Sequence, residues 1–158
     1  MVVNKFIRNL AKRNLGRLIG NFKYFNTKVF FPKNSLIFRI ACTEGIYDKE
    51  VLNFIFTYIK ENSLLIDVGT NIGLTSIPIL KNYNNTHVIS FEPSRSVFPF
   101  LKKTHLSSGL TDRWSIYDKA LGNTIGTVGF KRNREMIAHL MLFRFQKIRL
   151  TEDMMRLR

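Results

Sequence analysis

The segment Asp67-Val68-Gly69-Thr70-Asn71-Ile72-Gly73 combines residue types that bind small ligands with the position that ligand-binding loops take. It directly follows a short apolar run and precedes a helical pattern, which predicts a turn between a buried strand and a helix. Gly69 permits a sharp turn and a close approach of ligand to backbone, and the helix start offers free N–H groups. The carboxylate of Asp67 suits a cationic amino acid group here and would repel a pyrophosphate.

A second acidic residue, Glu92, stands about 25 residues after Asp67 in the run Ser90-Phe91-Glu92-Pro93, where the next predicted strand ends. A carboxylate at the end of the second strand is placed to accept hydrogen bonds from both hydroxyls of a ribose. The third predicted strand runs into Lys119-Ala120-Leu121-Gly122, whose small residues leave room for an adenine ring. The ends of three successive strands therefore predict a site for a nucleoside-containing cofactor.

NAD and S-adenosylmethionine are the two cofactors that compete for this interpretation. The NAD fingerprint is Gly-x-Gly-x-x-Gly, whereas this loop has Gly-x-x-x-Gly behind an aspartate, which favours S-adenosylmethionine because it has no phosphate to bind. We expect the loop to hold the amino acid portion, the second strand end to bind the ribose and the third to border the adenine. The predicted cofactor-binding residues are Asp67, Gly69, Thr70, Asn71, Gly73, Glu92, Pro93, Ala120 and Leu121.

Alternating strand and helix patterns must position these residues. Strands are predicted over 64–67, 87–91 and 114–117, with helices over 71–82 and 95–107 between them. Strands separated by helices of this length form a parallel sheet with right-handed crossovers. Pro78 and Pro99 fall inside the two predicted helices, where each removes a hydrogen bond and should kink or shorten its helix. The pattern predicts a three-layer α/β sandwich.

The N-terminal part of the chain predicts further elements. Residues 5–25 have the pattern of a basic amphipathic helix, which either packs its apolar stripe on the domain or lies on an anionic membrane surface. A strand is predicted over 27–31 with a turn over 32–35, and a helix over 47–60 with Asp48 as its N-cap.

The composition is that of a globular protein, with 158 residues, 45% apolar residues and a formal net charge of +14. The net positive charge comes from the two ends of the sequence. Residues 1–39 hold nine basic residues and no acid, whereas residues 40–130 hold eight basic and eight acidic residues. This distribution predicts solvated flanks and no specific nucleic-acid partner. The single cysteine, the lack of a long apolar run and the lack of a signal peptide predict a cytoplasmic protein, peripheral to the membrane if residues 5–25 bind lipid.

Five further residues have side-chain types that can act in catalysis or pack in a core. His87 and His105 are expected on the surfaces of a strand and a helix, and Trp114 in the core. Glu135 and His139 have the types of an acid–base pair but fall in an atypical tail. No His/Cys/Asp cluster has metal-ligand spacing, and no catalytic base is predicted.

The run from about residue 29 to 130 resembles the FkbM-type methyltransferases, an S-adenosylmethionine-dependent family. The resemblance implies a class I methyltransferase fold and methyl transfer, usually to a hydroxyl oxygen of a sugar, glycan or secondary metabolite. Thr70 stands where members often have alanine. The matching pieces are Tyr47-Asp48-Lys49-Glu50, residues 67–78 (DVGTNIGLTSIP), 88–94 (VISFEPS), 100–103 (FLKK) and 119–126 (KALGNTIG).

The resemblance stops before residue 131. Family members continue into a fourth strand with an acidic motif and three further strands, and residues 131–158 match none of this, although 140–148 alternate as one strand would. We therefore expect a basic helical extension over 1–45, the first half of a Rossmann-like domain over 46–130, incomplete at its C-terminal end, and an atypical basic tail over 131–158. Three functions stay open: a methyltransferase acting on a small-molecule or glycan acceptor, a truncated remnant that at most binds the cofactor, and a basic module that binds membranes or polyanions.

Overall fold

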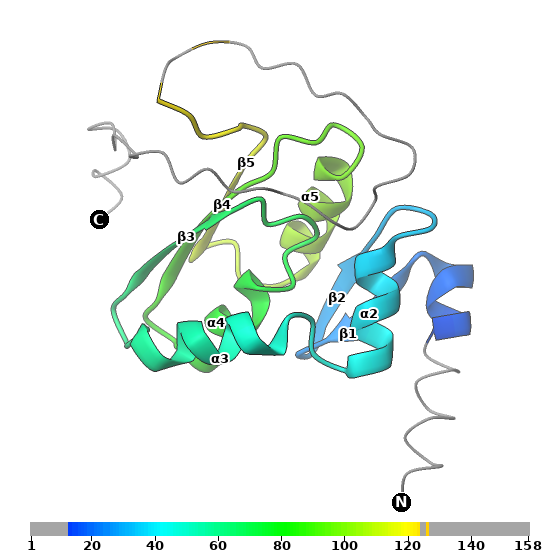
Figure 1. Ribbon diagram of the computed structural model, residues 1–158, viewed down its shortest axis with the longest axis horizontal. Coiled ribbons are helices and arrows are strands. Elements are labelled where there is room, and N and C mark those ends of the chain that lie inside the picture. Colours follow the sequence, from blue (N-terminus) through cyan, green and yellow to red (C-terminus); the bar gives the residue numbers. More distant parts are fainter. Residues whose placement is uncertain (1–12, 124–125, 127–158) are drawn as a thin grey trace, which may run out of the picture.

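The computed structural model describes residues 13–123 and 126 (Figure 1). The predicted strand over 140–148, the pair Glu135 and His139, and the first part of the predicted helix over 5–25 lie outside these residues. After a short helix over 13–19, the described elements follow one another as β1 (Asn21–Tyr24), β2 (Thr27–Phe30), α2 (Leu36–Glu44), α3 (Lys49–Tyr58), β3 (Leu64–Val68), α4 (Ser76–Asn82), β4 (His87–Phe91), α5 (Phe98–Ser107) and β5 (Trp114–Tyr117).

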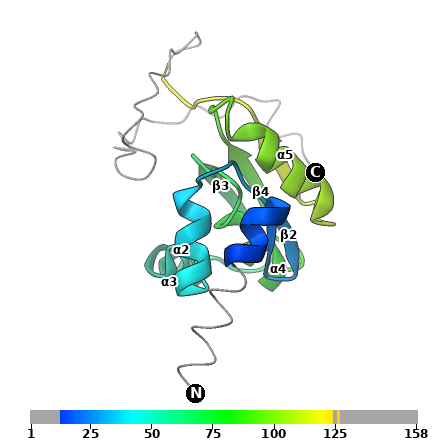
Figure 2. The same cartoon turned by 90° about the vertical axis from the view of Figure 1, so that its right-hand side faces the viewer.

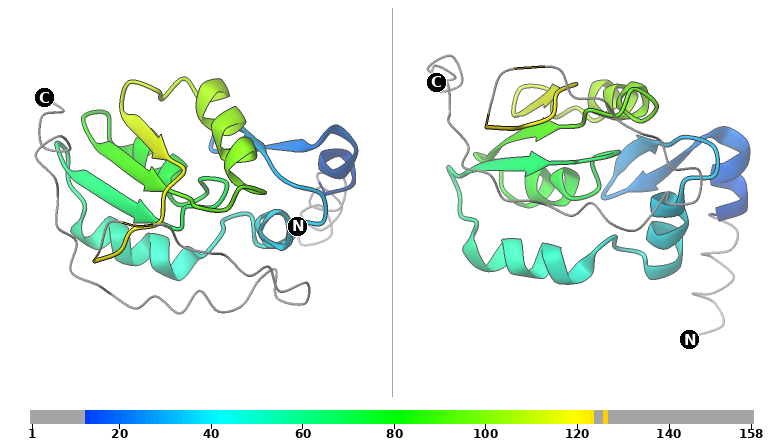
Figure 3. Two further views of the ribbon diagram at one scale, coloured as in Figure 1. Left: turned by 90° about the horizontal axis from the view of Figure 1, so that it is seen from above. Right: turned by 45° about the horizontal axis from the view of Figure 1, so that its top comes forward.

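The three strands that end at the candidate site form one parallel sheet in the order β3-β4-β5. β3 pairs with β4 from Leu64 opposite His87 to Val68 opposite Phe91, and β4 pairs with β5 as far as Phe91 opposite Tyr117. Because the strands are parallel, their carboxyl ends lie at the same edge (Figure 3). The predicted parallel α/β sheet is confirmed, and its strands begin at the predicted residues.

The helices that connect these strands are shorter than the sequence pattern predicts. α4 begins at Ser76 instead of residue 71, and α5 begins at Phe98 instead of residue 95. Each proline consequently stands in the first turn of its helix, where the backbone N–H groups have no intrahelical partner in any case. Pro78 and Pro99 thus set where the helices begin and do not kink them.

The predicted helix over 5–25 is wrong from residue 20 onward. The helix ends at Gly20, which has φ of +69°, and residues 21–30 form an antiparallel hairpin of β1 and β2. The two turn residues, Phe25 and Asn26, both have positive φ, as a two-residue hairpin turn of this hand requires. Within the hairpin, Phe22 and Tyr24 are buried and Lys23 is exposed, the alternation of a strand with one covered face.

The predicted amphipathic stripe is divided: Phe22, now in β1, is buried, whereas the leucines of the helix over 13–19 do not face the core. Leu15 and Leu18 are 59% and 84% exposed. The helix over 13–19 instead approaches α2 through Gly16, where an added Cβ would come within 2.9 Å of the Phe38 ring. The absence of a side chain at residue 16 therefore sets the contact between these two helices.

Two helices follow the hairpin, and the sequence pattern identified one of them. α2 was not predicted, although Ser35 caps it by accepting a hydrogen bond from the N–H of Phe38 at 3.2 Å. α3 was predicted, but the prediction that Asp48 caps it is wrong. Asp48 has left-handed backbone angles, and its side chain makes no capping hydrogen bond. The strand over 27–31 is confirmed as β2.

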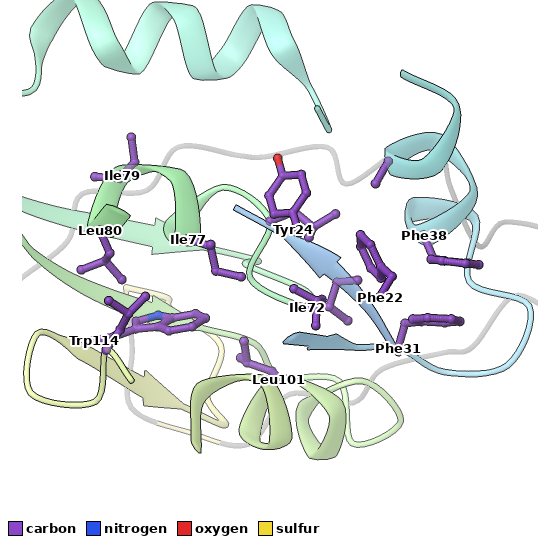
Figure 4. Packing of buried hydrophobic residues seen from close by; sticks show 14 of the residues in the cluster. Phe22, Tyr24, Phe31, Phe38, Ile72, Ile77, Ile79, Leu80, Leu101 and Trp114 are labelled. Atoms are coloured by element: carbon purple, nitrogen blue, oxygen red, sulfur yellow. The ribbon is translucent and has the colours of Figure 1, made fainter. Parts of the chain in front are cut away.

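A single hydrophobic cluster joins the hairpin, α2 and the parallel sheet (Figure 4). On the hairpin side, the rings of Phe31 and Phe38 are stacked 3.8 Å apart, and Phe22 packs on both. On the sheet side, the predicted core residue Trp114 is 1% exposed and lies in the same cluster as Leu101 of α5. The division of the chain at residues 45 and 130 stays a prediction.

Hydrogen bonds hold the hairpin against α5, beside which it lies in Figure 2. The N–H of Phe30 donates to the hydroxyl of Thr104 at 3.0 Å, and the hydroxyl of Ser107 donates to the carbonyl of Lys28 at 3.1 Å. Thr104 is fully buried, so its hydroxyl is shielded from competing water. None of the helices in the described part of the chain is both long and apolar enough to span a bilayer.

Candidate functional site

The loop between β3 and α4 passes over the end of β4 in a left-handed conformation. Gly69, Asn71 and Gly73 have φ of +80°, +54° and +90°. Glycine adopts such angles without a steric penalty, and asparagine is the side chain that tolerates them best. The glycine spacing that the sequence analysis singled out is therefore required by the backbone path.

The N–H groups of this loop are largely used inside the protein. Gly69 and Thr70 both donate to the carbonyl of Phe91, at 2.8 and 3.1 Å, and Asn71 donates to the carboxylate of Glu92 at 2.9 Å. Free N–H groups were predicted at the helix start, which lies further along the chain at Ser76. The first part of the loop is thus fastened to the end of β4.

Asp67, the next-to-last residue of β3, is half-buried, and one of its carboxylate oxygens is held by neighbouring hydroxyls. Its Oδ2 accepts hydrogen bonds from the hydroxyls of Thr70 at 2.6 Å and Ser76 at 2.5 Å. Burial raises the pKa of Asp67 above its usual value, and the two hydroxyl donors act in the opposite direction. Its other oxygen, Oδ1, accepts no hydrogen bond from any residue in 13–123.

The hydroxyl of Ser76 continues into a buried network that reaches β5. Ser76 Oγ lies 2.9 Å from Ser90 Oγ in β4, and the indole Nε1 of Trp114 donates to Ser90 Oγ at 2.9 Å. Ser76, Ser90 and Trp114 are at most 1% exposed. The network therefore connects the carboxylate at the end of β3 with a core residue of β5 across the width of the sheet.

Glu92, directly after β4, is 1% exposed, and each of its carboxylate oxygens accepts one hydrogen bond. One carboxylate oxygen accepts from the N–H of Asn71 at 2.9 Å and the other from the N–H of Ser94 at 2.8 Å. Burial raises the pKa of Glu92, the two N–H donors lower it, and repulsion from Asp67 raises it again. Glu92 thus ties together the loops after β3 and β4.

Gly73 lies against the face of the core tryptophan. A Cβ added there would come within 2.6 Å of the Trp114 ring, closer than side chains approach one another. The sequence analysis assigned Gly73 to the ligand, whereas its surroundings show a packing requirement. Its role toward a cofactor stays a prediction.

The remaining predicted site residues are less constrained. Pro93 is half-buried between Glu92 and Ser94, while Ala120 is exposed and Leu121 half-buried in the segment after β5. These positions follow the carboxyl ends of β4 and β5, so topology brings them to the same edge of the sheet as Asp67. Whether they touch a cofactor stays a prediction.

Three polar or amphipathic residues of the site escaped the sequence analysis: Ser76, Ser90 and the indole N–H of Trp114. The signal was present, because Ser90 interrupts the apolar strand His87–Phe91 and Ser76 opens an apolar helix. Buried polar groups nearly always have partners, so two serines in covered segments predict a mutual hydrogen bond. Thr70 was predicted as a cofactor-binding residue, and in the structure its hydroxyl contacts Asp67.

The histidines in the described residues show no catalytic arrangement. His105 on α5 shares a hydrogen bond of 2.6 Å with the carbonyl of Trp114, which fixes its ring, and His87 is exposed at the opposite end of β4 from Glu92. A search of the described residues finds no group of three His, Cys, Asp or Glu side chains that is arranged to hold a metal ion.

Comparison with known proteins finds similar solved structures. No family model and no curated protein matches the chain. A protein of Pyrococcus horikoshii described as a transferase is 21% identical, with a TM-score of 0.45 over 63% of this chain and 36% of its own. A Plasmodium falciparum protein described as a protein-L-isoaspartate O-methyltransferase, in complex with S-adenosyl-L-homocysteine, is 19% identical, with a TM-score of 0.35 over 58% and 41%.

An O-methyltransferase family 2 protein of Planctomyces limnophilus, in complex with apigenin, is 11% identical, with a TM-score of 0.33 over 69% of this chain and 47% of its own. The chain thus spans less than half the length of each of these three proteins.

Proposed function

We propose that this chain binds S-adenosylmethionine at the carboxyl ends of β3, β4 and β5 and belongs to the methyltransferases of the FkbM type. The observation that carries the proposal is the pairing of two carboxylates, one half-buried and one buried, with a loop whose first N–H groups are already used. Asp67 and Glu92 end neighbouring strands, and Gly69, Thr70 and Asn71 donate inside the protein.

This arrangement favours a cofactor without phosphates. A pyrophosphate is normally held by free N–H groups at the start of a helix, and two nearby carboxylates would repel it. S-adenosylmethionine instead offers an ammonium group and ribose hydroxyls, which are all hydrogen-bond donors. Acceptors at both strand ends therefore match the donor groups of this cofactor better than those of a dinucleotide.

The two carboxylates have the capacity to accept these donors. Oδ1 of Asp67 accepts no hydrogen bond from residues 13–123, so it is available to an ammonium group. Each oxygen of Glu92 accepts one N–H, and a carboxylate has about four lone-pair positions in all. Glu92 can accordingly accept ribose hydroxyls without releasing the loops that it holds.

Bound at this edge of the sheet, the cofactor would supply a methyl group for transfer from its sulfonium sulfur to an acceptor oxygen, with the neutral thioether as leaving group and the hydroxyl proton released to solvent. The protein's own contribution is to hold the cofactor in a fixed orientation, since alignment of the reacting atoms accounts for much of such catalysis. The rigid loop between β3 and α4 serves this purpose, because its backbone is fastened to Phe91 and Glu92. We propose a small-molecule hydroxyl as the acceptor and assign no catalytic base.

Isothermal titration calorimetry with S-adenosylmethionine, S-adenosylhomocysteine and NAD tests the proposal. We expect the two sulfur-containing ligands to bind and NAD not to bind. Asp67→Ala and Glu92→Ala should each weaken binding at least tenfold, because each removes a charged hydrogen-bond partner worth roughly 1.5–3 kcal/mol. Asp112→Ala is the matched control, because Asp112 is an exposed carboxylate just before β5, at the opposite end of the sheet.

Two results would overturn the proposal. One is the absence of S-adenosylmethionine binding by a folded sample, and the other is an equal loss of affinity in the Asp112→Ala control. Binding without methyl transfer to any hydroxyl acceptor would restrict the proposal to cofactor binding, the second function left open by the sequence.

A further inference from the structure

The buried network between Trp114 and Asp67 has a fixed direction. The indole Nε1 of Trp114 is only a donor, so Ser90 Oγ must accept there. The ionised carboxylate of Asp67 is only an acceptor, so Ser76 must give its proton to Oδ2. The remaining contact, 2.9 Å between Ser90 Oγ and Ser76 Oγ, is then donated by Ser90. Each hydrogen bond of this network is therefore donated in the direction of Asp67.

Thr70 adds a second donor to the same oxygen. Its hydroxyl lies 2.6 Å from Oδ2, and it is 3.3 Å from the Ser76 hydroxyl. Two donors from different elements, the loop and α4, hold Oδ2 in one place. The carboxylate is therefore fixed in one orientation, and its Oδ1 accepts no hydrogen bond from residues 13–123.

Burial strengthens the hydrogen bonds of this network. Ser76 and Ser90 are fully buried, and Trp114 is buried against Gly73. Water does not compete for hydrogen bonds in such surroundings, and neighbouring bonds polarise one another. The hydroxyls also favour the charged form of Asp67 against the burial that disfavours it.

We propose that Thr70, Ser76, Ser90 and Trp114 are positioning residues that fix the orientation of the Asp67 carboxylate and aim Oδ1 at the ammonium group of the bound cofactor. This inference rests on the proposed function, and it explains why hydroxyl-bearing residues stand at three covered positions around one carboxylate. A purely structural role would be satisfied by apolar side chains of similar size, because all three positions lie next to the hydrophobic core.

The test compares two probes that differ in the group Asp67 would bind. S-adenosylhomocysteine carries the amino acid portion with its ammonium group, and 5′-methylthioadenosine has the same nucleoside without it. Ser76→Ala and Thr70→Val should weaken S-adenosylhomocysteine roughly tenfold or more and leave methylthioadenosine within about twofold. Thr70→Ser, which keeps the hydroxyl, should retain the affinity of the unmodified protein.

Thr86→Ala is the matched control for loss of a buried hydroxyl. Thr86 is fully buried, donates to the carbonyl of Lys60 at 3.0 Å and precedes β4 at the end away from the site. Its substitution should lower stability and leave the affinities for both probes unchanged. Ser115→Ala on β5 is a second control, because its side chain has no hydrogen bond within the described residues.

The pH dependence of binding provides an independent measurement. The groups that contact Asp67 from the loop and α4 are neutral hydroxyls, and the charged group near it is Glu92 at the end of β4. Affinity for the ammonium-bearing probe should fall as pH drops through the pKa of Asp67. Removing a hydroxyl donor should move this midpoint to higher pH in Ser76→Ala and Thr70→Val, and not in Thr86→Ala.

Trp114 is the only tryptophan of the chain, so its fluorescence reports on the network. We expect S-adenosylhomocysteine to change this fluorescence in the unmodified protein and to change it much less in Ser90→Ala, which disconnects Trp114 from Ser76. An equal loss of affinity for both probes in Ser76→Ala and Thr70→Val would overturn the inference and leave the proposed function standing. Failure of the unmodified protein to bind either probe would instead reject the proposed function itself.

Discussion

The indole of Trp114 occupies the space where a side chain on Gly73 would lie. A Cβ built on Gly73 would approach Cη2 and Cζ2 of the ring to 2.6 and 2.8 Å, and Gly73 also has φ of +90°. The last glycine of the loop is therefore fixed by two separate requirements, one from the backbone and one from the core. Neither of them involves a ligand.

Gly73→Ala is expected to destabilise the protein by about 3 kcal/mol, which combines left-handed strain with overpacking against Trp114. Urea denaturation followed by the fluorescence of Trp114 measures this loss. Gly109→Ala is the control, since Gly109 has φ of +67° with nothing within 4 Å of the added Cβ, and it should lose only about 1 kcal/mol. Equal losses in the two variants would show that the contact with Trp114 has no energetic effect.

The half-buried carboxylate of Asp67 should make stability depend on pH. Because burial raises its folded-state pKa above the unfolded value, the folded protein binds the proton more tightly than the unfolded chain does. The contribution of Asp67 to stability is thus fully present below the usual aspartate pKa and is lost as pH rises through the raised value. Other acids titrate in the same range, so the informative quantity is a difference between two proteins.

Asp67→Asn should remove this part of the pH dependence. We expect the free energy of unfolding of the unmodified protein, relative to the variant, to fall as pH rises from about 3.8 through the raised pKa. Denaturation series at several pH values measure the difference. A difference that stays constant over that range would show that Asp67 titrates alike in the folded and unfolded states.

Arg113, directly before β5, hydrogen-bonds the backbone carbonyls at and after the C-terminal end of α4. Its guanidinium donates to the carbonyls of Leu80, Tyr83 and Thr86 at 2.8–3.0 Å. Arg113→Met, which keeps much of the apolar stem, should destabilise the protein by about 2 kcal/mol, because partly buried carbonyls lose a charged donor. Thermal unfolding measures the effect, and Arg95→Met, at an exposed position, should change stability by less than about 0.5 kcal/mol.

The attachment of the hairpin to α5 should depend on one hydroxyl. Thr104→Val preserves the shape of this fully buried side chain and removes the acceptor for the N–H of Phe30. The expected destabilisation is about 1–3 kcal/mol, the cost of an unpaired buried N–H. Hydrogen exchange should show that the amide of Phe30 is the group that loses protection, and unchanged protection there would contradict the assigned bond.

The elements with a strong local signal were predictable from the sequence. Strands β3, β4 and β5 are short apolar runs bounded by turn residues, and each was placed within one residue of its observed ends. The helices between the strands predicted a parallel sheet. A parallel sheet in turn places Asp67 and Glu92 at the same edge. What these carboxylates contact was not predictable, because their hydrogen bonds depend on residues brought together by the sheet.

The N-terminal hairpin was missed because two periodicities compete there. Phe22 and Phe25 are three residues apart, as on a helix face, while Phe22 and Tyr24 alternate with Lys23 as in a strand. The turn residues Phe25 and Asn26 lack the glycine that usually marks such a hairpin. The packing of Phe22 on Phe31 and Phe38, which lie outside residues 5–25, favours the strand.

The contact between β2 and α5 also determines when the hairpin can be stabilised during synthesis on the ribosome. The hydrogen bonds that secure the hairpin join residues 74 and 79 positions apart, so the hairpin leaves the ribosome well before the helix that secures it exists. Isolated two-stranded hairpins are only marginally stable in water. At the usual rate of about 5–20 residues per second, the helix that secures the hairpin is therefore made seconds after the hairpin.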